Sequence, residues 1–351
     1  MNRKTKSFII TFFIILCVAF SAVIFSACSS APKKEAVSVL IIPKFEIDEM
    51  SGDFPGEAQL FYEKYCKDCE EIEIPNMPDT AHFYYNDDND VGLLVAGVGK
   101  SIAGLSLSSL LSSDSYDFSN AYIVSVGCSG GSADYTTLGD VVLLTSVCDY
   151  DLGHKVDSRE LSDTESTDTW FPGEDYDKIA FKRLDKDLCK TAYGLTKDCP
   201  VKTTELSKKI LKKNFPDSKV ALRDPVVLKG TSASGDNFWK GEYGHRNAVK
   251  VAKYYGAPDP YAVTEMEEIG IMNAAESFGM LDRVISFRVV VNYDLFLRGE
   301  TPEGLWAKQD GYSDKVSEEN SETLDIFEPA MHNLFDVSSI VIDAILEGEI
   351  G

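Results

Sequence analysis

A glycine-rich run at the end of an apolar stretch is the first place in this sequence where residue types suggest chemistry. Gly127-Cys128-Ser129-Gly130-Gly131 matches G-x-S-x-G, in which a serine on a strand-to-helix turn is activated by a histidine and attacks a carbonyl carbon. The candidate bases for Ser129 are His154, His245 and His332. That pattern needs a helix directly after the glycines, whereas residues 132–140 are turn-like and lead into another apolar run. A serine hydrolase is therefore only a minor alternative.

Other short motifs give weaker evidence for a functional site. Gly99-Lys100-Ser101 lacks the earlier glycine of a phosphate-binding P-loop, because Leu94 stands at that position. Cys66 and Cys69 have C-x-x-C spacing, but a lone pair cannot complete a four-ligand zinc site. We therefore predict no metal and no cofactor. Export would permit disulfides, and a bridge between Cys189 and Cys199 across a surface insertion stays an open alternative.

The elements that position these residues follow from the apolar runs. Short β-branched runs predict buried strands, and apolar residues at helical spacing predict helices. Strands or core segments are expected at 37–42, 91–96, 121–126, 141–147, 223–229 and 284–291, and helices at 100–112, 247–255, 265–278 and after Pro329. This alternation predicts an α/β fold with a mostly parallel sheet, whose ligands bind at the carboxyl ends of strands. We expect one domain over residues 37–351, with a polar insertion at 155–218 and a linker at 29–36.

Composition and charge narrow the class of protein. The chain has 351 residues, of which 44% are hydrophobic and 26% charged, as in soluble globular proteins. Acidic residues number 57 against 34 basic residues, so the net charge is -23. A field of this sign repels nucleic acids, and we predict no nucleic-acid partner.

The first 28 residues predict that the protein is exported, and they are not expected to be part of the folded domain. Arg3, Lys4 and Lys6 precede an apolar stretch at 8–25, which ends in small residues before Cys28. This resembles a bacterial lipobox, in which the cysteine receives a lipid, so we expect a lipoprotein on the outer side of the cytoplasmic membrane. An uncleaved signal anchor is the alternative. One such segment cannot form a transport pore alone.

Five motifs follow one another in a fixed order. They are Gly97-Val98-Gly99-Lys100, Val126-Gly127-Cys128-Ser129-Gly130-Gly131, Leu138-Gly139-Asp140-Val141-Val142, Ser234-Gly235-Asp236-Asn237-Phe238 and Glu265-Met266-Glu267. This order resembles that of nucleoside phosphorylases and nucleosidases. Together with residues 41–46, 148–154 and 236–240, it makes residues 37–351 most similar to the family called purine nucleoside permeases. The resemblance implies a three-layer α/β/α domain that holds a purine nucleoside at the carboxyl edge of its sheet.

The resemblance also implies roles for individual residues. Met266 and Glu267 would hold the ribose, because a thioether packs on the apolar face of a sugar and a carboxylate accepts hydrogen bonds from vicinal hydroxyls. Phe238 would stack on the base, and Asp236 would brace its loop. Further expected contacts are Gly97, Ser129 and His154. The alternative for Glu265, Glu267 and Glu268 is that they are acids in the first turn of a helix, where the dipole favours them.

One catalytic position departs from the resembled enzymes. Cleavage of an N-glycosidic bond needs an acid that protonates N7 of the leaving purine. In the nucleosidases this acid lies four residues after an arginine. Here that spacing from Arg288 leads to Asn292, which can donate a hydrogen bond but cannot deliver a proton. We predict that Asn292 contacts the base and that Asp294, two residues later, is the acid if there is one.

Phosphate recognition departs as well. Bacterial-type phosphorylases have an arginine two residues before the glycine at the end of the third strand, and this chain has Ser125. Without that arginine a phosphate loses a bidentate partner, which favours water as the attacking group, although phosphate stays possible as a co-substrate. Glu46 and Asp48 are the candidates to orient water. The candidates to replace the arginine are Lys44, Lys100, Arg246 and Arg288.

Two functions therefore stay open. The first is a nucleoside-binding surface lipoprotein that takes part in purine nucleoside uptake, with a separate membrane protein supplying the pore. The second is an enzyme that releases the base from a nucleoside by hydrolysis or phosphorolysis. Because two catalytic positions depart while the ribose and base positions persist, we favour the first. The resembled enzymes also imply a possible homo-oligomer.

Overall fold

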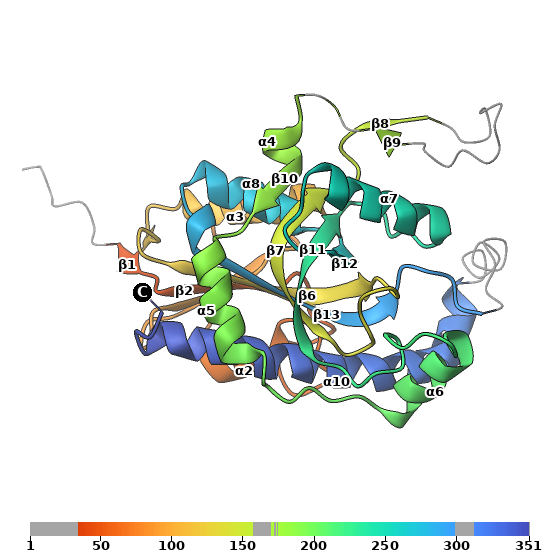
Figure 1. Ribbon diagram of the computed structural model, residues 1–351. Coiled ribbons are helices and arrows are strands. Elements are labelled where there is room, and N and C mark those ends of the chain that lie inside the picture. Colours follow the sequence, from red (N-terminus) through yellow and green to blue (C-terminus); the bar gives the residue numbers. More distant parts are fainter. Residues whose placement is uncertain (1–33, 157–169, 172, 174, 299–311, 351) are drawn as a thin grey trace, which may run out of the picture.

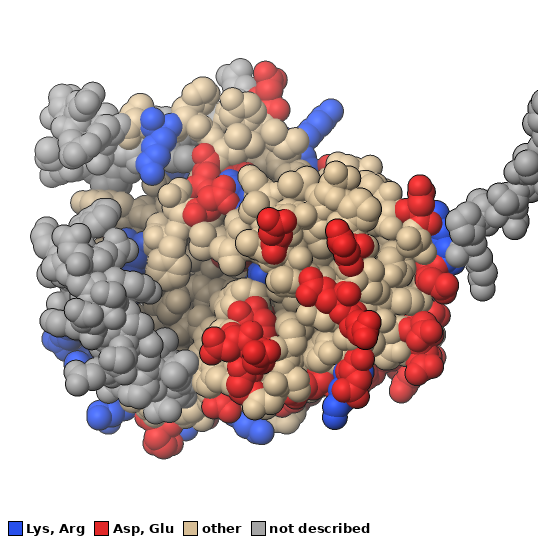
Figure 2. All heavy atoms as spheres, turned by 180° about the vertical axis from the view of Figure 1, so that it is seen from behind, with Lys and Arg blue, Asp and Glu red and all other residues tan. Residues whose placement is uncertain are grey.

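The computed structural model describes residues 34–156, 170–171, 173, 175–298 and 312–350. The expected export segment with Cys28, and part of the expected polar insertion, lie outside these ranges. None of the helices within them combines the length and the apolar character needed to cross a membrane. Figure 2 shows acidic side chains over much of one face of the molecule, as the net charge leads one to expect.

One large sheet forms the centre of the molecule (Figure 1). Its strands are β2 (Val39–Ile42), β3 (His82–Asn86), β4 (Val91–Val95), β6 (Tyr122–Gly131), β7 (Val141–Asp149), β10 (Phe181–Arg183), β11 (Val227–Ser234), β12 (Tyr261–Glu265) and β13 (Val284–Tyr293). The order is β10-β7-β11-β12-β6-β2-β4-β3, and β13 pairs with both β6 and β7. Strands β6, β12, β11, β7 and β13 therefore close into a hydrogen-bonded ring, with parallel and antiparallel pairs. Two small sheets pair β1 (Glu35–Ala36) with β5 (Tyr116–Asp117) and β8 (His154–Lys155) with β9 (Trp170–Phe171).

Helices cover both faces of the sheet, as expected for three layers (Figure 1). On one side lie α3 (Lys100–Leu111), α4 (Asp177–Ala180), α7 (Glu242–Tyr254) and α8 (Glu268–Ser277). On the other lie α2 (Gln59–Tyr65), α5 (Lys186–Thr196), α6 (Glu205–Asn214) and α10 (Tyr312–Leu346). A 3-10 turn, Leu281–Arg283, precedes β13. Within the expected insertion, β10 pairs with β7 and so extends the sheet itself.

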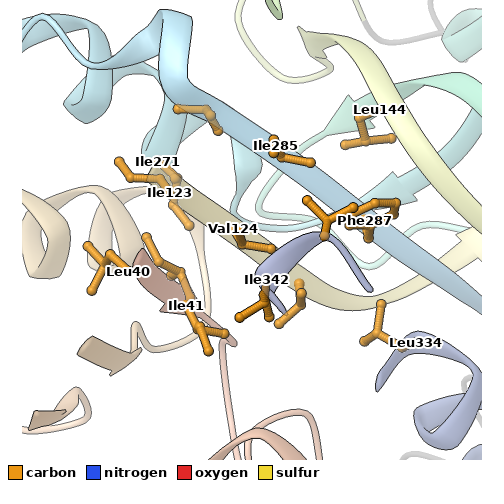
Figure 3. Close-up of a cluster of buried hydrophobic side chains, with 14 of the residues drawn as sticks. Leu40, Ile41, Ile123, Val124, Leu144, Ile271, Ile285, Phe287, Leu334 and Ile342 are labelled. Carbon is orange, nitrogen blue, oxygen red and sulfur yellow. The ribbon is translucent and has the colours of Figure 1, made fainter. Parts of the chain in front are cut away.

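The core lies between the sheet and these helices. Ile41 of β2, Val124 of β6 and Phe287 of β13 face Leu334 and Ile342 of α10 (Figure 3). Removing each such side chain from water contributes about 1.5–3 kcal/mol, which fixes the layers relative to each other. The expected terminal helix is longer than predicted: it begins at Tyr312 and contains Pro329, which costs it one backbone hydrogen bond.

The glycine-rich run does not break its strand, so the expected end of this strand at residue 126 is wrong. β6 continues through Gly131 because β13 pairs with it along this stretch. A Cβ at Gly130 would lie 2.9 Å from Oδ1 of Asn292, and one at Gly131 would lie 2.6 Å from a methyl of Val290. These glycines permit a close approach of neighbouring side chains rather than a turn.

The same strand excludes the geometry required by the serine hydrolase alternative. Ser129 lies inside β6 rather than on a strand-to-helix turn. Its hydroxyl donates to the carbonyl oxygen of Val289 at 3.1 Å. Because no helix follows the glycines, the nucleophile elbow of that enzyme class is not formed.

The described cysteines are free thiols, so the structure does not form the bridge between Cys189 and Cys199 that the sequence left open as an alternative. Cys189 is buried on α5, and its sulfur lies 3.6 Å from the carbonyl oxygen of Leu144. Cys66 and Cys69 are also free. Burial raises the pKa of the Cys189 thiol to about 12, which makes it unreactive near neutral pH.

Candidate functional site

A cavity lies where β2, β6, β12 and β13 end. Its walls come from four parts of the chain: 128–130 of β6, 264–267 at the end of β12, 291–294 at the end of β13, and the loop 237–239. Lys44, Phe45 and Glu57, which follow β2, and Val98, which follows β4, complete it. The predicted residues Met266, Glu267, Phe238, Asn292, Asp294 and Ser129 all line this cavity. They lie up to 165 positions apart (294 − 129) and are brought together by the ring of strands.

The three acids at the start of α8 have different roles. Glu265 ends β12, and its Oε2 accepts the backbone N–H groups of Glu267 at 2.8 Å and Glu268 at 2.7 Å. This satisfies two donors that the first turn of a helix leaves free. Glu268 points into the protein, where it is fully buried. Glu265 and Glu267 both line the cavity, whereas Glu268 lies in the first turn of α8, so the alternative of an acid in the first turn of a helix holds for Glu268 alone.

Glu267 is held by the loop before α3. Its Oε1 accepts the backbone N–H of Gly99 at 3.1 Å. Gly99 has a φ of +94°, a conformation that a residue with a side chain rarely adopts. Burial, followed by repulsion from Glu265, raises the pKa of Glu267 to about 7. This carboxyl group therefore titrates near neutral pH. The expected contact Gly97 does not line the cavity; it turns the chain after β4 with a φ of +84°.

Asp294 is buried at the base of the cavity, and its two oxygens differ. Oδ2 accepts hydrogen bonds from Tyr261 at 2.7 Å and from Nδ1 of His245 at 2.8 Å. Oδ1 is buried and has no hydrogen-bond partner in the part of the chain that the structure describes. An unpartnered buried carboxylate oxygen costs free energy, so this oxygen is suited to a ligand donor or to a proton.

His245 connects Asp294 to the surface. Its Nε2 lies 3.2 Å from Oδ2 of Asp134, which is exposed. Burial alone would lower the pKa of His245, but its hydrogen bonds and charge interactions with Asp294 and Asp134 raise it overall. His245 comes from α7 and Asp134 from the loop after β6. This pairing could not be predicted from the sequence, because His245 and Asp294 are 49 positions apart without a shared motif.

A buried group of charges begins at Lys44 in the wall of the cavity and extends into the protein. Arg288 of β13 donates from Nη2 to Oε2 of Glu268, and Nζ of Lys44 lies 3.5 Å from the same oxygen. Nζ of Lys44 also donates to the hydroxyl of Ser125 at 2.6 Å. Burial and the charge of Arg288 lower the pKa of Lys44 to about 8, although Glu268 opposes this. Ser125 therefore belongs to a lysine–glutamate network, where the resembled phosphorylases place an arginine.

The prediction for Glu46 is wrong on position. Its carboxylate does not line the cavity; it accepts the backbone N–H groups of Ile47, Gly56, Ala58 and Gln59 and so caps α2. Because its carboxylate oxygens already accept these four hydrogen bonds, Glu46 is committed to holding the start of α2. Glu57 lines the cavity instead, and no motif in the sequence marked it.

Three other predicted residues lie at or beyond the rim. Phe238 lines the mouth of the cavity and is 76% exposed, so one ring face is open to a ligand. Asp236 lies outside; its Oδ1 accepts the N–H of Lys100 at 2.8 Å, which braces the loop as expected. His154 is exposed on β8, with its ring centroid 6.4 Å from that of Tyr176, and it does not line the cavity.

The four cations that were candidates for phosphate recognition do not converge. Lys100 pairs with Asp149 at 2.9 Å and Asp151 at 3.3 Å. Arg246 pairs with Glu242 on the surface of α7. Only Lys44 and Arg288 meet, and they share Glu268.

Comparison with known proteins agrees with the order of the motifs. Residues 36–349 match the model of a family described as purine nucleoside permease, which confirms the expected resemblance. A probable purine nucleoside permease of Schizosaccharomyces pombe is 24% identical over 174 residues, which cover 45% of this chain and 49% of that protein. The match thus spans about half the length of this curated relative.

Solved structures show the same mixed α/β fold. A 5'-methylthioadenosine/S-adenosylhomocysteine nucleosidase from Colwellia psychrerythraea, in complex with adenine, has a TM-score of 0.50 and 19% identity over 90% of this chain and 96% of that chain. Futalosine hydrolase of Helicobacter pylori has a TM-score of 0.52 and 14% identity over 88% and 97%. At these identities the likeness establishes the fold alone.

Proposed function

Because the chain belongs to the purine nucleoside permease family, we propose that its cavity binds a purine nucleoside and that this binding serves nucleoside uptake. One observation carries the proposal. A carboxyl group, a thioether, an open aromatic ring and a buried oxygen without a partner line the same cavity: Glu267, Met266, Phe238 and Asp294.

Each group suits a different part of a nucleoside. Glu267 would accept hydrogen bonds from the ribose hydroxyls while Met266 packs on the apolar face of the sugar. Phe238, at the mouth, would stack on the base, and stacking of this kind contributes about 0.5–1.5 kcal/mol beyond burial. Asn292 and Oδ1 of Asp294 would meet polar atoms on the edge of the base.

The place of this binding is also a proposal. A lipid on Cys28 would hold the domain at the outer side of the cytoplasmic membrane, where it would collect nucleosides. A separate membrane protein would supply the pore. Labelling of the full chain with a radioactive fatty acid tests the anchor, and Cys28→Ala should abolish that label.

The direct test is binding. Addition of inosine or adenosine to residues 29–351 should raise the temperature of thermal unfolding, since a ligand that binds only the folded state stabilises it. If neither nucleoside changes the unfolding temperature, nucleoside binding is excluded as the function.

Asp294 supports a second candidate, which is hydrolysis of the N-glycosidic bond. A proton on Oδ1 would pass to N7 of the purine as the bond between C1' and N9 breaks and its electron pair leaves with the base. Water would attack C1' and give its proton to a carboxylate, for which Glu57 and Glu267 are the candidates in the cavity. The hydrogen bonds from His245 and Tyr261 to Oδ2 would stabilise the carboxylate that forms on Asp294.

If this second function operates, Asp294→Ala should reduce release of free base from inosine by at least about 100-fold, the range of a lost general acid. Chromatography of the free base measures this. Asp198→Ala, which removes an exposed carboxylate, is the control and should leave the rate unchanged. Absence of free base with the unaltered protein would leave binding as the sole function.

Nucleoside affinity should fall as the pH drops below about 7. Glu267, whose pKa is raised from 4.5 to about 7, accepts hydroxyl hydrogen bonds best as a carboxylate, and that form is lost below this pH. Affinity should weaken by up to about tenfold per pH unit, and calorimetric titration measures it. Glu267→Gln should remove this dependence; a curve unchanged by that substitution would assign it to another group.

The same group affects the stability of the unliganded protein in the opposite direction. Its folded pKa lies above its unfolded value, so the folded state binds the proton more tightly. The stabilising contribution of Glu267 is therefore complete below pH 4.5 and is lost as the pH rises through about 7.

A further inference from the structure

Glu57 is a carboxylate of the cavity that accepts hydrogen bonds from the backbone N–H groups of two different strands or strand ends. Its Oε2 accepts the N–H of Lys44 at 2.9 Å, just after β2, and its Oε1 accepts the N–H of Cys128 at 2.7 Å, within β6. The side chain is buried, with 4% of its surface exposed, and it lines the cavity. Converging backbone donors of this kind form a binding site for an anion.

A buried cation lies next to the same carboxylate. Nη1 of Arg288 has no hydrogen-bond partner among the residues that the structure describes, and Arg288 is fully buried. A Cβ at Gly127 would overlap this nitrogen and would lie 3.0 and 3.1 Å from the two oxygens of Glu57. The guanidinium and the carboxylate therefore lie on either side of a glycine whose missing side chain leaves room for both, without forming an ion pair. Glu57 is also among the charges that raise the pKa of Arg288 against the effect of burial.

We propose that Glu57 is a built-in anion that fills an anion site in the cavity and closes it to phosphate. The site has the parts that an oxyanion needs, which are two backbone donors and a buried guanidinium. Because the chain's own carboxylate accepts both backbone donors, a phosphate would meet both a filled space and a like charge.

The proposal narrows the substrate class. It rests on the proposed function only for the identity of the nucleoside, while the anion site itself stands on the contacts of Glu57. A cavity closed to phosphate takes a nucleoside without an anionic co-substrate. Any cleavage there would then be hydrolysis.

The test removes the carboxylate and supplies phosphate instead. Thermal unfolding of the full chain is measured with and without roughly 20 mM inorganic phosphate at constant ionic strength. Phosphate should raise the unfolding temperature of Glu57→Ala by several degrees and leave that of the unaltered chain unchanged. Glu73→Ala, which removes an exposed carboxylate outside the cavity, is the matched control and should not respond.

A second variant separates size from charge. Glu57→Gln keeps the volume of the side chain, so it should fold and should not respond to phosphate. If Glu57→Ala is unfolded in phosphate-free buffer, recovery of the fold on adding phosphate or formate supports the proposal, and failure of both overturns it. A folded Glu57→Ala chain that ignores phosphate also overturns it, as does a response of the unaltered chain.

Failure of this inference can be told from failure of the proposed function. Inosine is titrated into the unaltered chain in the same assay. If inosine has no effect while phosphate stabilises Glu57→Ala, the anion site is supported and nucleoside binding is contradicted. If inosine stabilises the chain while phosphate has no effect on Glu57→Ala, the nucleoside site stands and the role of Glu57 falls.

Discussion

Replacement of Glu268 by alanine is expected to lower the free energy of unfolding by about 3–5 kcal/mol, the cost of breaking a buried ion pair on one side. Glu268 is fully buried and pairs with both Arg288 and Lys44. Its removal leaves two cations in the interior with fewer partners. The charges of Arg288 and Lys44 outweigh the effect of burial and hold the pKa of Glu268 below its ordinary value, so the group is ionised. Urea unfolding measures the change.

Glu242→Ala is the control for that experiment. Glu242 forms an exposed pair with Arg246 one turn later on α7, and such pairs contribute about 0.2–0.5 kcal/mol. If Glu268→Ala costs no more than Glu242→Ala, the buried charges are not mutually dependent and the account of the network is wrong.

Glu267→Ala should weaken nucleoside binding by about 10- to 150-fold, because hydrogen bonds to a charged group contribute about 1.5–3 kcal/mol. The reason is local: the side chain lines the cavity and Gly99 orients it. Calorimetry near pH 8, where the group is ionised, measures the effect. Glu267→Gln keeps one acceptor oxygen and should lose less.

The fold of this variant should be preserved, because Glu265 and not Glu267 caps α8. Circular dichroism checks this before the titration. Glu276→Ala, near the other end of α8 and outside the cavity, should bind nucleoside as the unaltered chain does. If Glu267→Ala and Glu276→Ala bind the nucleoside with equal affinity, Glu267 does not contact the ribose.

The strands could be predicted from sequence because their apolar runs are buried on both faces. The run around Ile123 and Val124, for instance, is completely buried in β6. The end of that strand could not be predicted, since glycine usually interrupts a strand. Here Gly127, Gly130 and Gly131 make room for side chains of β13, which is remote in sequence.

The candidate site was predictable only where a motif carried it. Met266, Glu267, Asn292 and Asp294 lie at the ends of strands and line the cavity. Glu46 was misplaced because its spacing after β2 is equally suited to capping the next helix, and the folded chain uses it there.

Other parts of the site depend on contacts that one sequence does not encode locally. Glu57 lies 71 positions from Cys128, whose backbone N–H it accepts, and it stands in no motif. His245 meets Asp294 only because α7 packs against β11 and β12. Pairings of this kind become visible once the sheet is closed.

The ring of β6, β12, β11, β7 and β13 has a mechanical consequence for ligand exchange. None of these five strands offers a free edge within the ring, so the base of the cavity cannot widen without breaking several backbone hydrogen bonds at once. Entry and exit therefore take place at the mouth, where Phe238 is exposed. The rate at which a ligand leaves would then be set by the residues at the mouth. The ring of strands would keep the same shape with and without a ligand in the cavity.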